Sequence, residues 1–173
     1  MAKKDVDGYF PLIYNEVRTI ARSFKLKYSA DQTLQTTEIA HEAYIKLREN
    51  KNLVINDIHH VKSLAARAIR FILVDYVRNK RSLKKGEGNK PLDIMDLSIE
   101  IPDHIEDNIL QIDEILDELC KIDENRCKLV ECRFFAGYTI EETATIMGTS
   151  VATVKRSWQV TKTWLYQQIK NQQ

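Results

Sequence analysis

The chain has 173 residues, enough for one ordinary domain or two small ones, and its 26 Lys and Arg nearly balance 25 Asp and Glu. It shows no signal peptide and no apolar run of the about 20 residues that a membrane-spanning helix needs. These features argue against secreted and integral membrane proteins and favour a cytoplasmic location. Only five glycines and three prolines occur, and no stretch alternates polar and apolar residues as a half-buried strand would. We therefore expect an all-α protein.

The cysteines and the absence of catalytic motifs argue against a metalloprotein or an enzyme. Cys120, Cys127 and Cys132 form no CxxC pair, and their odd number argues against a disulfide framework. We expect buried thiols, because free cysteine is among the most buried residue types. The sequence contains no glycine-rich phosphate loop, HExxH motif or recognisable nucleophile. We predict no catalytic, cofactor-binding or metal-binding residue.

The nearly neutral total charge conceals blocks of opposite sign. Residues 59–90 carry nine Lys and Arg against two Asp and Glu, and residues 125–173 carry seven against three. Between them, residues 91–124 carry twelve acids against one lysine. Two basic blocks around an acidic one suggest two modules that face nucleic acid and a segment that avoids it.

The first two predicted helices span residues 7–24 and 36–48. The first has an apolar stripe that is typical of a scaffold helix. The second directs Ile39, Ala43 and Leu47 toward the core. Its opposite face is acidic but contains one apolar residue, which favours a protein partner, although acidic faces are often simply solvated. This acidic face comprises Glu38, His41, Glu42, Ile45 and Glu49.

A polar loop over residues 50–58 leads into a long helix predicted over residues 59–84. Ala65, Ala68 and Ile72 lie on one face, and cations recur along the opposite stripe over about 27 Å of helix. Arginine suits phosphates and base edges, so we interpret the stripe as a nucleic-acid contact, with a solvated basic face as the alternative. The stripe comprises Arg67, Arg70, Arg78, Arg81 and Lys85.

Residues 85–104 hold two of the five glycines and two of the three prolines, which predicts a linker. Helices should resume over residues 105–121 and 124–135, the second capped by Asp123. We expect these two helices to pack against the helices that follow and to form a compact four-helix module.

The most informative stretch is residues 139–165. Thr139 and Glu142 form a capping box that starts a helix, and Gly148 ends that helix in the left-handed conformation. Ser150 caps a second helix, in which Val154 packs inward while the opposite face is polar and basic. Two helices joined by three residues predict a DNA-binding helix-turn-helix, with a plain helical hairpin as the alternative. The free face and its flanks comprise Ser150, Ala152, Thr153, Lys155, Arg156, Gln159 and Lys162.

Three segments, in this order, resemble the extracytoplasmic-function (ECF) sigma factors of bacteria, and the resemblance extends over nearly the whole chain. TTEIAHEAYIKL resembles the helix that grips the RNA polymerase clamp. LAARAIRFILVDYVRNKR resembles the helix that melts and reads the −10 element. LVECRFFAGYTIEETATIMGTSVATVKRSW resembles the module that reads the −35 element.

The resemblance implies a sigma factor that binds RNA polymerase core through the beta-prime clamp and beta flap, directs it to promoter DNA and helps to melt the −10 region. It implies two small helical domains: residues 1–85 for core and −10 binding, a linker over residues 86–104, and a −35-binding helix-turn-helix domain over residues 105–173. The acidic face of residues 36–48 would contact the polymerase, and the free face of the last helix would contact the −35 element. The −10 contacts would be Asn52, Asn56, Arg67, Arg70, Arg78 and Arg81. An anti-sigma factor or other recruiting protein is a further expected partner.

Two other interpretations stay open at this point. A stand-alone helix-turn-helix regulator with a helical sensor domain would bind duplex DNA without polymerase. A recombinase or nuclease would need a catalytic cluster in the first half, where none is recognisable. Recovery of polymerase core in a pull-down separates a sigma factor from the stand-alone regulator.

Overall fold

The computed structural model describes residues 7–28, 34–49, 53–84 and 103–171, and within these ranges every element is helical. The prediction of an all-α fold is confirmed. No helix within these ranges is both long and apolar enough to span a bilayer. The elements in chain order are η1 (Asp7–Tyr9), α1 (Phe10–Tyr28), α2 (Leu34–Glu49), α3 (Ile58–Lys84), α4 (Asp103–Ile122), α5 (Glu124–Val130), η3 (Glu131–Phe135), α6 (Ile140–Met147) and α7 (Val151–Asn171).

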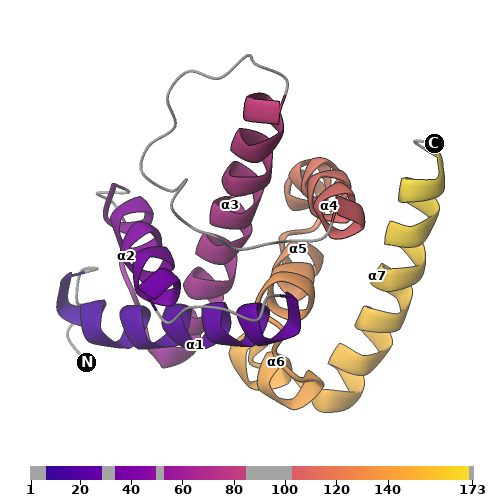
Figure 1. Ribbon diagram of the computed structural model, residues 1–173. Helices are drawn as coiled ribbons and strands as arrows, with labels where there is room; N and C mark the ends of the chain where they lie inside the picture. The colour runs from indigo at the N-terminus through magenta and orange to yellow at the C-terminus, as the bar shows by residue number, and fades with distance from the viewer. Residues whose placement is uncertain (1–6, 29–33, 50–52, 85–102, 172–173) are drawn as a thin grey trace.

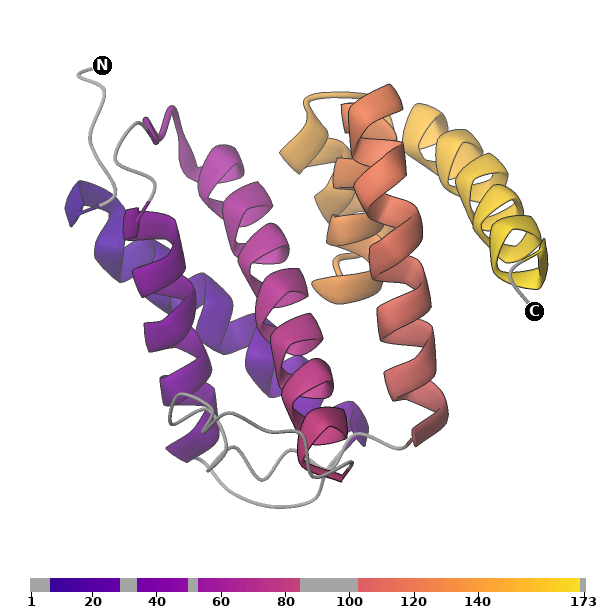
Figure 2. The same cartoon turned by 90° about the horizontal axis from the view of Figure 1, so that it is seen from above.

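Helix α3 lies between two groups of helices (Figure 1). On one side it packs against α2 and against α1, which crosses both of them (Figure 2). On the other side it packs against α4, η3 and α6, while α7 lies on the outer side of α4 and α5. A single apolar cluster includes buried residues of every α-helix from α1 to α7. The two ends of the chain therefore share one core around α3.

The predicted helices are all present, and two of them differ in detail. The first begins as the 3₁₀ turn η1 and continues as α1 to Tyr28. The helix predicted over residues 124–135 starts as α5, where the Asp123 side chain accepts a hydrogen bond from the Arg126 backbone N–H at 3.0 Å. It ends as the π-helical turn η3, in which the Ala136 N–H donates to the Glu131 carbonyl at 3.0 Å. This wider turn was not predicted, because its i+5 bond has no marked sequence signal.

The local signals around α6 and α7 act as predicted. The Thr139 hydroxyl accepts from the Glu142 N–H at 3.1 Å, and the Glu142 carboxylate accepts from the Thr139 N–H at 2.7 Å. Gly148 has φ 63°, in the left-handed region where a side chain is strained. The Ser150 hydroxyl accepts from the Thr153 N–H at 3.1 Å and so starts α7. These contacts set the two helices and the three-residue turn between them.

Candidate functional site

Helix α7 presents one exposed face that contains the side chains predicted to read DNA. Val154, Thr161 and Leu165 are buried beneath it, and Val154 packs with Leu129 and Ala144. The Ser150 and Thr153 hydroxyls lie 2.8 Å apart, which fixes both side chains at the start of the helix. All seven predicted residues are exposed: Ser150, Ala152, Thr153, Lys155, Arg156, Gln159 and Lys162.

Helix α2 presents a second exposed face, which is acidic and partly apolar. Its inward residues Ile39, Ala43 and Leu47 are buried, as predicted. On the outer face Glu42 is half-buried, the Glu38 side chain lies outside the described part of the chain, and three residues are exposed: His41, Ile45 and Glu49. An open hollow of about 290 Å³ crosses this face, lined by His41, Tyr44, Ile45, Arg48 and Glu49.

The segment before α3 is held in place by the helix start. Asn52 lies outside the described residues, and Asn56 is exposed. The Asn56 N–H donates to His60 Nδ1 at 3.2 Å, and Asp57 accepts from the His60 N–H at 2.8 Å. This second bond lowers the pKa of Asp57 below its ordinary value. Asp57 therefore caps α3 and sets the position of the neighbouring Asn56.

The arginines of α3 do not form the single exposed stripe that was predicted. Arg67 and Arg78 are exposed and Arg81 is half-buried. Arg70 is only 2% exposed, so the prediction that it lies on the open face is wrong. Lys85 lies outside the described residues. Helical periodicity predicts which residues of α3 share one face. It does not predict that other helices cover part of that face.

Three carboxylates from the second half of the chain surround the Arg70 guanidinium. Its Nε donates to Asp113 Oδ1 at 2.8 Å, and its Nη2 donates to Asp117 Oδ1 at 2.6 Å. Its Nη1 donates to Glu131 Oε1 at 3.2 Å. Asp113 also accepts from Arg78 Nη2 at 2.8 Å through its second oxygen, Oδ2. We call these five residues the arginine–carboxylate cluster, which joins α3 to α4 and η3.

The electrostatics of the cluster follow from burial and from shared charges. Burial alone would lower the pKa of Arg70, but Asp113 and Glu131 outweigh it and hold the pKa above its ordinary value. Burial raises the pKa of Glu131 despite the opposing effect of Arg70. Arg70 is shared among three carboxylates, so its charge offsets the burial of Glu131 only in part. Buried charges need partners, so Arg70 is stabilised only while α4 and η3 cover it.

The sequence did contain a signal for this cluster, which our prediction missed. Helix α3 carries seven Lys and Arg against one Asp, whereas α4 carries seven Asp and Glu against one Lys. We interpreted the acidic block only as a segment that avoids nucleic acid. Opposite charges on two long helices of one chain also indicate that the helices can pair with each other.

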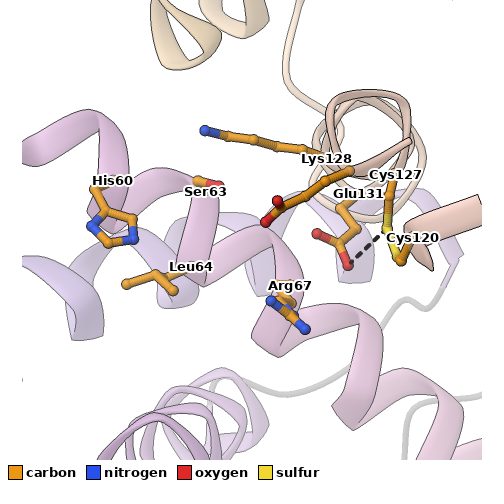
Figure 3. A pocket seen from close by; sticks show the side chains of 9 residues that line it. His60, Ser63, Leu64, Arg67, Cys120, Cys127, Lys128 and Glu131 are labelled. Atoms are coloured by element: carbon orange, nitrogen blue, oxygen red, sulfur yellow. Dashed lines mark hydrogen bonds between the residues drawn. A yellow bond between two sulfur atoms is a disulfide. The ribbon is translucent and has the colours of Figure 1, made fainter. Parts of the chain in front are cut away.

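A polar pocket of about 240 Å³ lies beside the cluster, between α3 and α5. Figure 3 shows His60 and Arg67 on the α3 side, facing Lys128 and Glu131 on the other. Burial lowers the pKa of His60, and the nearby Lys128 shifts it in the same direction.

Two of the three cysteines lie at this pocket and form a disulfide, Cys120–Cys127 (Figure 3). The prediction of free thiols is therefore wrong for this pair, which spans the turn between α4 and α5. Cys132 is free and buried, as predicted, and burial raises its pKa to about 12. Among the described residues, the only close group of metal-ligand donors is this pair with Glu131. Its sulfurs are bonded to each other rather than present as thiolate ligands, so we assign no metal site.

Comparison with known protein families identifies the family of the chain. A family model described as ECF sigma factor matches residues 2–171, nearly the whole chain. The chain belongs to the ECF sigma factor family. No curated protein and no solved structure shows a significant match.

As an ECF sigma factor, the protein acts in promoter-directed initiation of transcription, with RNA polymerase and promoter DNA. The family consists of non-enzymatic transcription regulators, which often work with anti-sigma factors. The resemblance inferred from the sequence is thereby confirmed.

Proposed function

We propose that this ECF sigma factor uses three separate surfaces: α2 for the polymerase, α3 with its preceding segment for the −10 element, and α7 for the −35 element. The observation that carries the proposal is the exposed polar and basic face of α7, held in place by buried Val154. On this proposal residues 1–85 and 105–173 are the two binding domains and residues 86–104 the linker. Because RNA polymerase and the chromosome are cytoplasmic, the protein acts in the cytoplasm.

The α2 face suits a basic, partly apolar surface of the polymerase, which we take to be the beta-prime clamp. Glu42 and Glu49 provide negative charge around exposed Ile45, and the hollow beside Ile45 can receive an apolar side chain. A salt bridge of 2.8 Å between Lys46 and Asp75 fixes α2 against α3. Polymerase binding and promoter melting would thus occur on one rigid unit. The C-terminal module would contact the beta flap.

The −10 surface combines cations with an aromatic ring. The Arg67 guanidinium lies 5.7 Å from the centre of the Phe71 ring, and that ring is 39% exposed. An exposed ring flanked by cations can stack an unpaired base, and promoter melting requires that bases leave the duplex stack. Asn56 at the start of α3, with Asn52 nearby in the sequence, would hydrogen-bond such a base. Arg78 and Arg81 would complete this surface.

The −35 surface would lie in the major groove. Arg156 can donate two hydrogen bonds to guanine O6 and N7, and Lys155 and Lys162 at the flanks would bind phosphates. Ser150, Ala152, Thr153 and Gln159 are the remaining candidates for base edges.

The test is co-purification with RNA polymerase core. The double substitution Glu42→Lys with Ile45→Ala should abolish it, because charge and apolar contact are both lost. The helical signal and the free energy of unfolding should stay within about 0.5 kcal/mol of wild type, as for most surface changes. The matched control is Glu114→Lys, an exposed charge reversal on α4 away from this face. Undiminished co-purification of the double variant would contradict the assignment of α2 as the polymerase contact.

A further inference from the structure

We propose that Cys120 and Cys127 are a reversible thiol–disulfide pair, in which Cys120 exchanges with low-molecular-weight thiols that enter the pocket beside α3. The proposal rests on the proposed function in one respect, because it takes the chain to act in the cytoplasm with RNA polymerase. It adds to the binding surfaces of the sigma factor a site of covalent modification, whose reactants are small thiols and disulfides.

The compartment decides how this bond behaves. Reductants of the cytoplasm keep most thiols reduced, and the disulfides that form there are usually transient, catalytic or redox-sensing. The bond joins the last turn of α4 to α5 across seven positions of the sequence. Both cysteines line the polar pocket of about 240 Å³, so a small thiol can reach the bond without unfolding the chain. A disulfide in this setting opens and closes with the supply of reductant.

The two sulfurs differ in access. Cys120 is half-buried, whereas Cys127 is only 3% exposed, although both lie at the wall of the pocket (Figure 3). A thiolate that attacks a disulfide must approach one of the two sulfurs directly, so access decides which sulfur reacts. Cys120 is therefore the sulfur that an external thiolate attacks, and Cys127 is the sulfur that leaves.

A charged group beside each sulfur agrees with these roles. Arg70 Nη1 lies 3.7 Å from Cys120 Sγ, and a neighbouring cation favours the thiolate, which is the reactive form of cysteine. Glu131 Oε1 lies 3.9 Å from Cys127 Sγ. The Glu131 carboxylate can accept the proton of the Cys127 thiol when the bond closes and return it when the bond opens.

Reduction consists of two exchange steps. The thiolate of an external thiol attacks Cys120 Sγ, so an S–S bond forms to Cys120 and the Cys120–Cys127 bond breaks. The electron pair of the broken bond stays on the Cys127 sulfur, which takes up a proton. A second external thiolate then attacks the external sulfur of the mixed disulfide and releases Cys120. Two external thiols are thereby oxidised to one small disulfide, and their two protons pass to the two cysteines.

The first experiment measures the redox equilibrium of the full native chain. The chain is equilibrated with mixtures of reduced and oxidised glutathione and quenched with acid, and mass spectrometry counts the thiols that an alkylating reagent labels after unfolding. A large excess of reduced glutathione should give the dithiol form, and an excess of oxidised glutathione should restore the disulfide. The matched control, Cys132→Ser, removes the third cysteine and should leave this equilibrium unchanged. A disulfide that resists reduced glutathione until the chain unfolds would overturn the proposal.

The second experiment identifies the reacting sulfur. Cys127→Ser leaves Cys120, and Cys120→Ser leaves Cys127, each with buried Cys132 as an internal reference. At pH 8 the native Cys127→Ser chain should react with a chromogenic disulfide at least about tenfold faster than the Cys120→Ser chain, because it retains the accessible sulfur beside Arg70. Equal rates would overturn the assignment of Cys120 as the exchanging residue.

A measurement on the wild-type chain decides the matter if either variant fails to melt cooperatively. The reduced native chain is treated briefly with iodoacetamide, and peptide mapping shows which cysteine is alkylated first. Cys120 should precede Cys127, and the opposite order would overturn the assignment.

Co-purification of the reduced wild-type chain with polymerase core is measured in parallel. Loss of this co-purification rejects the proposed function. Retained co-purification, together with a disulfide that glutathione does not reduce in the native chain, rejects the redox pair alone.

Discussion

The hydroxyl of Tyr138 donates a hydrogen bond of 2.7 Å to the carboxylate of Glu16, across 122 positions of the sequence. A longer bond of 3.3 Å connects the same hydroxyl to the backbone carbonyl of Lys62. Burial and the bond to Glu16 raise the pKa of Tyr138 well above its ordinary value, so the hydroxyl stays protonated and remains a donor. The turn between η3 and α6 is thereby fixed against α1 and α3. With the arginine–carboxylate cluster, this is a second polar contact between the halves.

Removing this hydroxyl should lower the stability of the fold. Tyr138→Phe keeps the ring in the core but leaves Glu16 without its short hydrogen bond. The free energy of unfolding should fall by about 1 kcal/mol, the net worth of one hydrogen bond, in urea titrations followed by circular dichroism. Tyr166→Phe, at a ring that is 69% exposed, is the control and should change nothing measurable. Equal effects of the two substitutions would show that the Tyr138 bond contributes no stability.

Local sequence signals were sufficient to predict that the helices are present and to place some of their ends. The capping box at Thr139 and Glu142, the left-handed Gly148 and the cap at Asp123 each act within a few residues, so their effects can be predicted without the fold. The exposed face of α7 followed from the same periodicity, with Val154 buried.

Long-range partners could not be predicted in this way. Arg70 meets Asp113 across 43 positions, and helical periodicity gives the face of a residue but not what covers that face. The disulfide was missed for a different reason, because its two cysteines are only seven positions apart. Cys120 and Cys127 lie in different helices, and the turn that brings them together has no cysteine-spacing signature.

The turn at Gly148 gives a prediction for stability. No atom lies within 4 Å of a Cβ built at this position, so a substitution costs backbone strain and not a clash. Gly148→Ala should lower the free energy of unfolding by about 1 kcal/mol, because φ 63° disfavours a side chain. Gly148→Asn should cost less, since Asn tolerates this conformation. Chemical denaturation of both variants measures the difference, and an equal cost for Asn and Ala would contradict the explanation.

The cysteines should differ sharply in reactivity. The chain purified without reductant should show no reactive thiol in the native state at pH 8, because Cys132 is buried with a pKa of about 12. The unfolded chain should react with one equivalent of a thiol reagent, through Cys132. After reduction and unfolding, the chain should react with three equivalents. Titration with a chromogenic disulfide counts the thiols. Three equivalents before reduction would contradict the Cys120–Cys127 bond.

The α7 face predicts two distinct kinds of DNA-binding defect. Arg156→Ala should relax the preference at one −35 base pair, with a loss of about 1–3 kcal/mol of discrimination. Lys162→Ala should instead weaken binding to all promoters alike. The slope of log K against log salt concentration should become smaller by about one. Selection from randomised −35 sequences with polymerase holoenzyme separates the two effects. If wild type and Arg156→Ala select the same bases with equal strength, Arg156 is not a base reader.

Co-purification with RNA polymerase core, followed by transcription from promoter DNA, tests most directly whether the chain acts as a sigma factor through the proposed surfaces. The wild-type chain should bind core and direct transcription from specific promoter fragments. Glu42→Lys with Ile45→Ala should do neither, because α2 loses both its charge and its apolar contact. Glu114→Lys, an exposed charge reversal on α4, should behave as wild type. Core binding and promoter-specific transcription that persist undiminished in the double variant would contradict the account.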